Sequence, residues 1–265
     1  MKNEKINLNG VKNIVVVASG KGGVGKSTVS ANIAVSLMHM GYKVAIVDAD
    51  IYGPSIPKMF GVENMHPEII LIDGKEMMNP IEKNKIKIMS IGFFVDANQG
   101  LIWRGPMVSN AIMQLFENTN WGDIDFMIID FPPGTGDIQL TATQKLIMSG
   151  AILVTTPQEI SLNDARKAAS MFMNPDINLP IIGVIENMSC FIPEKHPDEQ
   201  YFIFGKNGGR KMSEEYKTKL LGQIPLVIEV GEAADIGKSV FELKTNIVKK
   251  EFENISQSIV DFLNK

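Results

Sequence analysis

The chain has 265 residues, of which 45% are hydrophobic and 21% charged, and its formal net charge is −4. This length and composition predict a folded chain with a sizeable core, and the charge gives no general attraction to nucleic acid or to an anionic membrane. One cysteine excludes an intramolecular disulfide, and no long apolar stretch indicates a membrane span or a signal peptide. We therefore expect a cytoplasmic protein with neither nucleic acid nor membrane among its partners.

Short apolar runs and helix-like segments alternate along the chain and predict an α/β fold. The apolar runs lack polar alternation, which is typical of a doubly wound, mostly parallel sheet with helices on both faces. Residues 1–265 are expected to form one domain, with residues 1–11 a short leader, a peripheral hairpin turning at Asp73-Gly74 and a loop over residues 51–57. We expect strands at residues 14–18, 44–47, 85–90, 126–130, 150–157, 181–187 and 220–225, and helices at 29–40, around 108–116, at 162–173 and at about 247–263.

A glycine-rich stretch follows the first expected strand and precedes the first expected helix. It matches the phosphate-binding pattern G-x-x-x-x-G-K-[ST], from Gly20 to Gly25-Lys26-Ser27. Glycines leave backbone N–H groups free to turn toward a polyphosphate, and the helix N-terminus adds its positive dipole end. We expect Lys26 to contact the β- and γ-phosphates of ATP and the Ser27 hydroxyl to bind Mg²⁺. The residues predicted to bind the nucleotide are Gly22, Gly23, Val24, Gly25, Lys26, Ser27 and Thr28.

Carboxylates follow two of the expected strands and should lie at the same edge of the sheet. Asp130 ends one strand, where it is placed to hold a Mg²⁺-bound water beside Ser27. Asp48 and Asp50 follow another strand; one of them would polarise the attacking water and the other bind Mg²⁺ or its water shell, or either would cap the local turn. We favour Asp50 for orienting the water, and we count Asp50 as well as Ser27 and Asp130 among the Mg²⁺ ligands.

Two further features flank these groups. The segment Pro132-Pro133-Gly134-Thr135-Gly136 is expected to order with ATP and relax after hydrolysis, and Asp137 after it to cap the next helix. Lys21 occupies a position that the general phosphate-loop pattern leaves open. From its spacing alone, Lys21 is either a solvated loop lysine or a cation that serves a nucleotide other than its own.

Together these strings resemble the deviant Walker A ATPases of the MinD/ParA/NifH group, the SIMIBI NTPases. Four further strings resemble the Mrp/ApbC branch, whose members act as ATP-dependent iron–sulfur cluster carriers. The resemblance implies a homodimeric ATPase in which Lys21 acts catalytically in trans beside Lys26 and Asp50. It also implies that Asn187 reads the adenine edge and that iron–sulfur client or assembly proteins are the partners. The four strings are Asp48-Ala49-Asp50-Ile51-Tyr52-Gly53-Pro54-Ser55-Ile56-Pro57, Trp103-Arg104-Gly105-Pro106, Asp130-Phe131-Pro132-Pro133-Gly134-Thr135-Gly136-Asp137 and Glu186-Asn187-Met188-Ser189.

The chain departs from this branch at the residues that would hold a cluster. The relatives place a Cys-x-x-Cys pair shortly after the Asn-Met-Ser string, and those positions fall here on Pro193 and His196, whereas the only cysteine is Cys190. A [4Fe–4S] cluster shared by two subunits needs four thiolates, two from each. Cys190 is thus either a candidate iron–sulfur ligand, alone or with His196, or an ordinary small apolar residue, and His196 is otherwise a solvated side chain.

Two other functions stay open from the sequence. One is a positioning ATPase that resembles MinD or ParA and acts on a membrane or on DNA, although residues 255–265 lack a basic amphipathic face and no basic, aromatic-rich patch indicates DNA binding. The other is a nucleotide-dependent adaptor that binds an apoprotein without holding a cluster itself.

Overall fold

A single mixed sheet of eight strands forms the centre of the computed structural model, which describes residues 5–94, 105–244 and 246–264. The strand order is β10-β9-β8-β1-β7-β2-β6-β5, and every neighbouring pair is parallel except β5 with β6. The inner strands carry almost only β-branched and other apolar residues and are buried on both faces. The bounds are β1 (Val11–Ala18), β2 (Val44–Asp48), β5 (Ile81–Lys83), β6 (Ile86–Ser90), β7 (Ile124–Asp130), β8 (Gly150–Thr155), β9 (Ile181–Phe191) and β10 (Lys219–Leu226).

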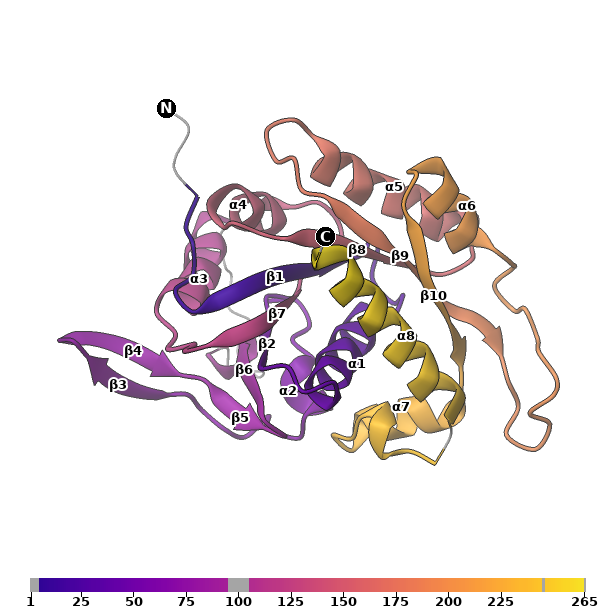
Figure 1. Ribbon diagram of the computed structural model, residues 1–265, viewed down its shortest axis with the longest axis horizontal. Coiled ribbons are helices and arrows are strands. Elements are labelled where there is room, and N and C mark those ends of the chain that lie inside the picture. The colour runs from indigo at the N-terminus through magenta and orange to yellow at the C-terminus, as the bar shows by residue number, and fades with distance from the viewer. Residues whose placement is uncertain (1–4, 95–104, 245, 265) are drawn as a thin grey trace.

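Helices cover both faces of this sheet (Figure 1), so the predicted doubly wound α/β fold is confirmed. One layer contains α1 (Lys26–His39), α2 (Ile56–Met59), α7 (Ile228–Asp235) and α8 (Asn246–Leu263), and the other contains α3 (Gly105–Glu117), α4 (Asp137–Lys145), α5 (Glu159–Met173) and α6 (Gly208–Glu215). Two short 3₁₀ turns, η1 (Ile91–Phe93) and η2 (Val240–Glu242), complete the order. Of the described helices, none is long and apolar enough to cross a bilayer.

A separate antiparallel hairpin of β3 (Glu68–Ile72) and β4 (Lys75–Asn79) projects from the body (Figure 1). Asp73 and Gly74 form its turn with φ angles of 51° and 78°, as a two-residue hairpin turn of this type requires. The predicted peripheral hairpin is therefore confirmed. The next strand, β5, pairs antiparallel with β6 at the edge of the main sheet, and β6 pairs with β2.

Several boundaries differ from the prediction. The expected loop over residues 51–57 ends in α2, and both α6 and α7 were not expected from the sequence. Strand β9 continues past the expected end to Phe191, so Asn187 and Cys190 lie within a strand. Asp137 is the first residue of α4, Gly136 occupies the N-cap position, and the predicted capping role of Asp137 is wrong. Of the Trp103-Arg104-Gly105-Pro106 string, Trp103 and Arg104 lie outside the described residues.

The backbone at Gly20, just after β1, lies very close to the backbone of helix α5. A Cβ atom added there would lie 1.9 Å from the backbone carbonyl carbon of Asp164 in α5. No side chain fits between these two backbones. The packing of α5 on the sheet therefore fixes where the glycine-rich stretch begins.

Gly20→Ala is expected to lower the free energy of unfolding by about 3 kcal/mol, because one of the two backbones must move. The matched control is Gly41→Ala, where φ is +93° but no atom lies within 4 Å of the added Cβ. Only backbone strain of about 1 kcal/mol is expected at Gly41. Urea denaturation of both variants measures the difference, and equal losses would contradict the close approach.

Candidate functional site

The glycine-rich stretch forms a loop between β1 and α1 and leaves the first turn of α1 open. Gly25 takes the N-cap position with φ of 78°, and no side chain caps the helix there. A Cβ at Gly25 would lie 2.2 Å from Nδ2 of Asn187, so glycine is required for space as well as for backbone angle. The uncapped N–H groups and the helix dipole together favour an anion.

A cavity of about 220 Å³ opens over this loop. Gly22, Gly23 and Gly25 line it from the loop, and Ser27 and Thr28 line it from α1. Lys21 lines it from the same loop, and Asp50 and Pro133 reach it from two other segments of the chain. Of the residues predicted to bind the nucleotide, Val24 is not among those that line the cavity, and its side chain is buried in the hydrophobic core.

Lys26 forms a buried ion pair at the base of the cavity. Its Nζ lies 2.8 Å from Oδ1 of Asp130, 3.7 Å from Oδ2 of Asp50 and 3.3 Å from Oγ of Ser27. The side chains of Lys26 and Asp130 are 6% and 0% exposed. The structure thus brings together the four side chains that were predicted to bind the phosphates and Mg²⁺. Asp130 Oδ2, also buried, has no hydrogen-bond partner among the described residues.

Ser30 belongs to the same cluster, although the sequence analysis did not identify it. Its hydroxyl lies 2.7 Å from Oδ1 of Asp130 and 3.0 Å from the carbonyl oxygen of Lys26. A serine inside a helix gives no pattern that predicts such a contact. The periodicity offers the one available signal, because Ser30 follows Lys26 by four residues and so lies on the same face of α1.

The two neighbouring carboxylates Asp48 and Asp50 have different surroundings. Asp48 is fully buried and accepts hydrogen bonds from the backbone of Asp50 and Ile56 and from the Ser90 hydroxyl. Burial, followed by repulsion from Asp130, raises the pKa of Asp48 to about 7. Asp48 therefore stabilises the loop over residues 50–56 through hydrogen bonds, and it is not among the residues that line the cavity.

Asp50 is the carboxylate that reaches the cavity. Burial raises its pKa, the positive charge of Lys26 opposes this shift, and repulsion from Asp130 adds to it. Its Oδ1 accepts a hydrogen bond of 3.3 Å from the backbone of Tyr52. Of the two aspartates, only Asp50 lines the cavity over the glycine-rich loop.

Lys21 lies at the rim of the same cavity and is half-buried. Its carbonyl oxygen accepts a hydrogen bond from the Ser19 hydroxyl, which fixes the backbone at this position. Its ammonium group forms no ion pair with any residue in the described part of the chain.

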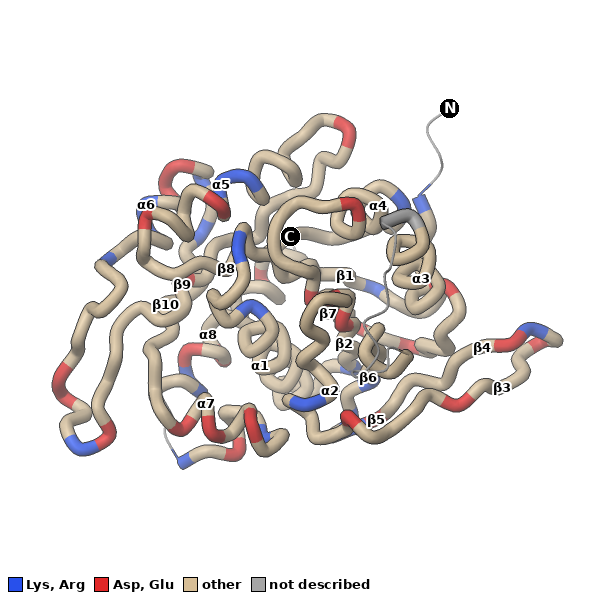
Figure 2. Tube along the Cα trace, turned by 180° about the vertical axis from the view of Figure 1, so that it is seen from behind, with Lys and Arg blue, Asp and Glu red and all other residues tan. Residues whose placement is uncertain are grey.

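Figure 2 shows that basic and acidic positions are interspersed along the described chain, so that neither sign of charge dominates it.

Asn187 touches the loop directly. Its Nδ2 donates a 2.8 Å hydrogen bond to the carbonyl oxygen of Val24, and its side chain packs against Gly25. Asn187 therefore joins the strand β9 to the phosphate loop. Asn187 was expected at the end of a strand, whereas β9 continues four residues further, to Phe191.

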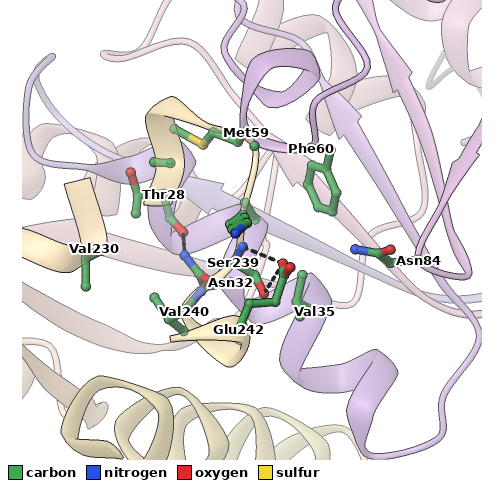
Figure 3. A pocket seen from close by; sticks show the side chains of 14 residues that line it. Thr28, Asn32, Val35, Met59, Phe60, Asn84, Val230, Ser239, Val240 and Glu242 are labelled. Carbon is green, nitrogen blue, oxygen red and sulfur yellow. Dashed lines mark hydrogen bonds between the residues drawn. The ribbon is translucent and has the colours of Figure 1, made fainter. Parts of the chain in front are cut away.

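A second, much smaller cavity of about 20 Å³ lies behind the loop, between α1, α2, α7 and η2 (Figure 3). Asn32 spans it, donating to the carbonyl oxygen of Thr28 and accepting from the backbone of Val240. Ser239 and Glu242 close a capping box beside it. This volume is room for about one water molecule, so the cavity supports α1 rather than holding a ligand.

Cys190 and His196, the candidate iron–sulfur ligands, lie in surroundings that do not favour metal binding. Cys190 is buried, and burial raises the pKa of its thiol, which disfavours the thiolate that binds metal. His196 is 65% exposed and lies 3.6 Å from a carboxylate oxygen of Glu199. Within the described ranges, no three His, Cys, Asp or Glu side chains are grouped to hold a metal ion. The residues present do not fit a [4Fe–4S] cluster.

The chain is similar to several known proteins. A family model described as the NUBPL iron-transfer P-loop NTPase matches residues 10–260. The chain is 48% identical to an iron–sulfur cluster carrier protein of Synechocystis over 86% of its own length and 64% of that protein. It thus spans less than two thirds of that relative.

Two further proteins extend the comparison. The chain is 42% identical to a mitochondrial iron–sulfur protein of Arabidopsis thaliana required for NADH dehydrogenase, over 98% of this chain and 82% of that protein. A solved nucleotide-binding protein of Archaeoglobus fulgidus in complex with ADP superposes with a TM-score of 0.76 at 33% identity. The superposition covers 89% of this chain and 91% of that one.

Lys26→Ala is expected to destabilise the nucleotide-free protein by about 3 kcal/mol, because it leaves the buried Asp130 carboxylate without its cation. Adding Asp130→Asn to the same variant should recover most of that loss. Chemical denaturation measures both, and Lys12→Ala serves as the control, since Lys12 pairs with Asp125 at the same 2.8 Å distance but with 71% of its side chain exposed. A loss in Lys26→Ala no larger than in Lys12→Ala would contradict the buried pair.

Proposed function

The chain belongs to the NUBPL iron-transfer P-loop NTPase family, and on that premise we propose that it is a Mg-ATP-hydrolysing ATPase that acts in iron–sulfur cluster carriage or assembly. The observation that carries the proposal is the convergence of Lys26, Asp50 and Asp130 under an open phosphate loop. The names of the relatives support the role in iron–sulfur cluster carriage or assembly. The ADP in the Archaeoglobus structure supports the nucleotide.

The residues under the loop fit a nucleotide and its magnesium ion. The backbone of Gly22 to Thr28 would hold the phosphates, with Lys26 neutralising the terminal ones. Ser27 and the unpartnered oxygen of Asp130 have the hard oxygen donors that Mg²⁺ prefers, and Asp50 completes this set. When bound, the ion would neutralise charge on the phosphates. Asp50, held by the 50–56 loop, would orient the water that attacks the terminal phosphate.

Lys21 is assigned to the partner subunit's nucleotide in a homodimer. Its ammonium group makes no ion pair with the described residues of its own chain, and it stands at the rim of the cavity. A second cation at the phosphates would stabilise the charge that develops during phosphoryl transfer. Asn187, already fastened to Val24, would contact the adenine edge.

The iron–sulfur cluster is cargo in this proposal, and this chain does not hold it by a cysteine pair. Each subunit contributes one thiol, which is buried and has a raised pKa. A homodimer thus supplies two of the four thiolates that a [4Fe–4S] cluster needs. This observation favours, as a second candidate, the nucleotide-dependent adaptor that binds an iron–sulfur apoprotein while other ligands hold the cluster.

Lys21→Ala and Asp50→Ala are each expected to lower the ATP turnover number about 100-fold, with nucleotide affinity nearly unchanged. An equimolar mixture should regain about a quarter of the wild-type rate, because half of the dimers are mixed and one of their two sites is intact. Phosphate release under saturating Mg-ATP measures this recovery. No recovery would show that Lys21 acts in cis, and wild-type turnover by Lys21→Ala would remove its role entirely.

Anaerobic reconstitution with iron and sulfide tests the cargo step. The isolated chain is expected to retain well under one [4Fe–4S] cluster per dimer after desalting, and Cys190→Ser should retain the same amount, since the buried thiol is not a ligand. Iron and sulfide analysis with visible absorption provides the measurement. A stable, stoichiometric cluster that disappears in Cys190→Ser would overturn this assignment and restore Cys190 as a ligand.

A further inference from the structure

The loop after Asp130 is held in place from two sides. Phe131 and Gly134 donate backbone hydrogen bonds to the carbonyl oxygens of Val17 and Ser19, which belong to β1 and to the start of the phosphate loop. The Ser19 hydroxyl continues this chain to the carbonyl oxygen of Lys21. The position of the loop is therefore linked to that of Lys21 through the backbone and the hydroxyl group of Ser19.

Gln139 supplies the second side of this support. Its Nε2 donates 2.7 Å and 3.3 Å hydrogen bonds to the carbonyl oxygens of Pro132 and Gly134, on either side of Pro133. The residue is 1% exposed and comes from the buried face of α4. Both N–H bonds of its amide thus point at the loop.

The composition of the loop explains why such a donor is needed. Pro132 and Pro133 have no N–H groups, so this segment offers carbonyl oxygens without donors of its own to pair with them. A buried amide costs free energy unless it is hydrogen-bonded, and an apolar side chain would fill the same place in the core without that cost. The amide of Gln139 is therefore explained by its hydrogen bonds to the loop, and the packing of α4 alone would not require it.

We propose that Gln139 is a positioning residue that holds the Pro132–Gly136 loop against the phosphate loop in the arrangement that ATP hydrolysis uses. Gly22 and Pro133 approach each other across this contact, with 3.9 Å between a Cβ added at Gly22 and Cγ of Pro133. Without the amide, the middle of the loop keeps the backbone hydrogen bond from Gly134 to Ser19, and its ends keep those from Phe131 to Val17 and from Leu140 to Gly136. The inference rests on the proposed ATPase function for its kinetic part and on the structure alone for the position of the loop.

Gln139→Met tests the proposal, because methionine matches the length and helix propensity of glutamine and lacks the two donors. The turnover number is expected to fall about tenfold, as the loss of one to two buried hydrogen bonds implies, while the dissociation constant for ADP stays within about twofold. Gln139→Asn keeps the amide on a shorter side chain, and its turnover number should lie between those of the wild type and of Gln139→Met. Thr143→Val is the matched control. The Thr143 hydroxyl bonds only to backbone carbonyls within α4, those of Gln139 and Leu140 at 2.7 Å and 3.1 Å, so its loss leaves the Gln139 side-chain amide on the loop and should retain wild-type turnover.

Hydrogen exchange of the nucleotide-free protein gives a readout that does not depend on activity. In Gln139→Met, the peptide covering residues 131–137 should exchange about tenfold faster, and the other peptides of α4 and β1 should exchange at the wild-type rate. Unchanged exchange in that peptide, or an equal loss of turnover in Thr143→Val, would overturn the positioning role. A wild-type protein without ATPase activity would overturn the proposed function instead, and the exchange experiment would still decide whether Gln139 holds the loop.

Discussion

The buried pair between Lys26 and Asp130 is the interaction on which the rest of the site depends. A lysine and an aspartate this deep in the protein are tolerated because each compensates the charge of the other, with Ser30 adding a hydroxyl beside the shared oxygen. The two residues come from the start of α1 and the end of β7, which are 104 positions apart. The pair forms because the sheet places the N-terminus of α1 beside the carboxyl end of β7.

The strand order explains this convergence. β1 lies between β7 and β8, and β7 lies between β1 and β2, so the loops after β1, β2 and β7 open at the same edge of the sheet. Register places Asp130 beside both Val17 and Asp48. Ligands of open α/β sheets bind at this carboxyl edge, where strand order reverses. The phosphate loop, Asp50 and the Pro132–Gly136 loop are thus neighbours through topology, and side-chain hydrogen bonds then adjust each segment.

Residues that belong to a continuous pattern could be predicted from the sequence, and residues that act through a distant partner could not. The buried strands, the phosphate loop and the roles proposed for Lys26, Ser27 and Asp130 follow from apolar runs and fixed spacing. Ser30, Ser90 and Gln139 belong to no local pattern, because the aspartates that Ser30 and Ser90 bind lie 100 and 42 positions away and Gln139 binds a loop rich in proline. The sequence favoured Asp50 over Asp48 for orienting the water but left a capping role open for either, and the hydrogen bonds that Asp48 accepts from Ile56 and Ser90 now distinguish the two. The short helices α6 and α7 are held by tertiary contacts that periodicity does not reveal.

In the proposed ATPase, Asp130 has a second partner besides Lys26, a magnesium ion that arrives with the nucleotide. The most direct measurement is the dissociation constant of a non-hydrolysable ATP analogue with and without Mg²⁺, in the wild-type protein and in Asp130→Asn. Magnesium is expected to tighten binding to the wild type about tenfold or more and to have little effect on the variant. Binding to the wild type that does not depend on magnesium, or a full magnesium effect in Asp130→Asn, would contradict the account.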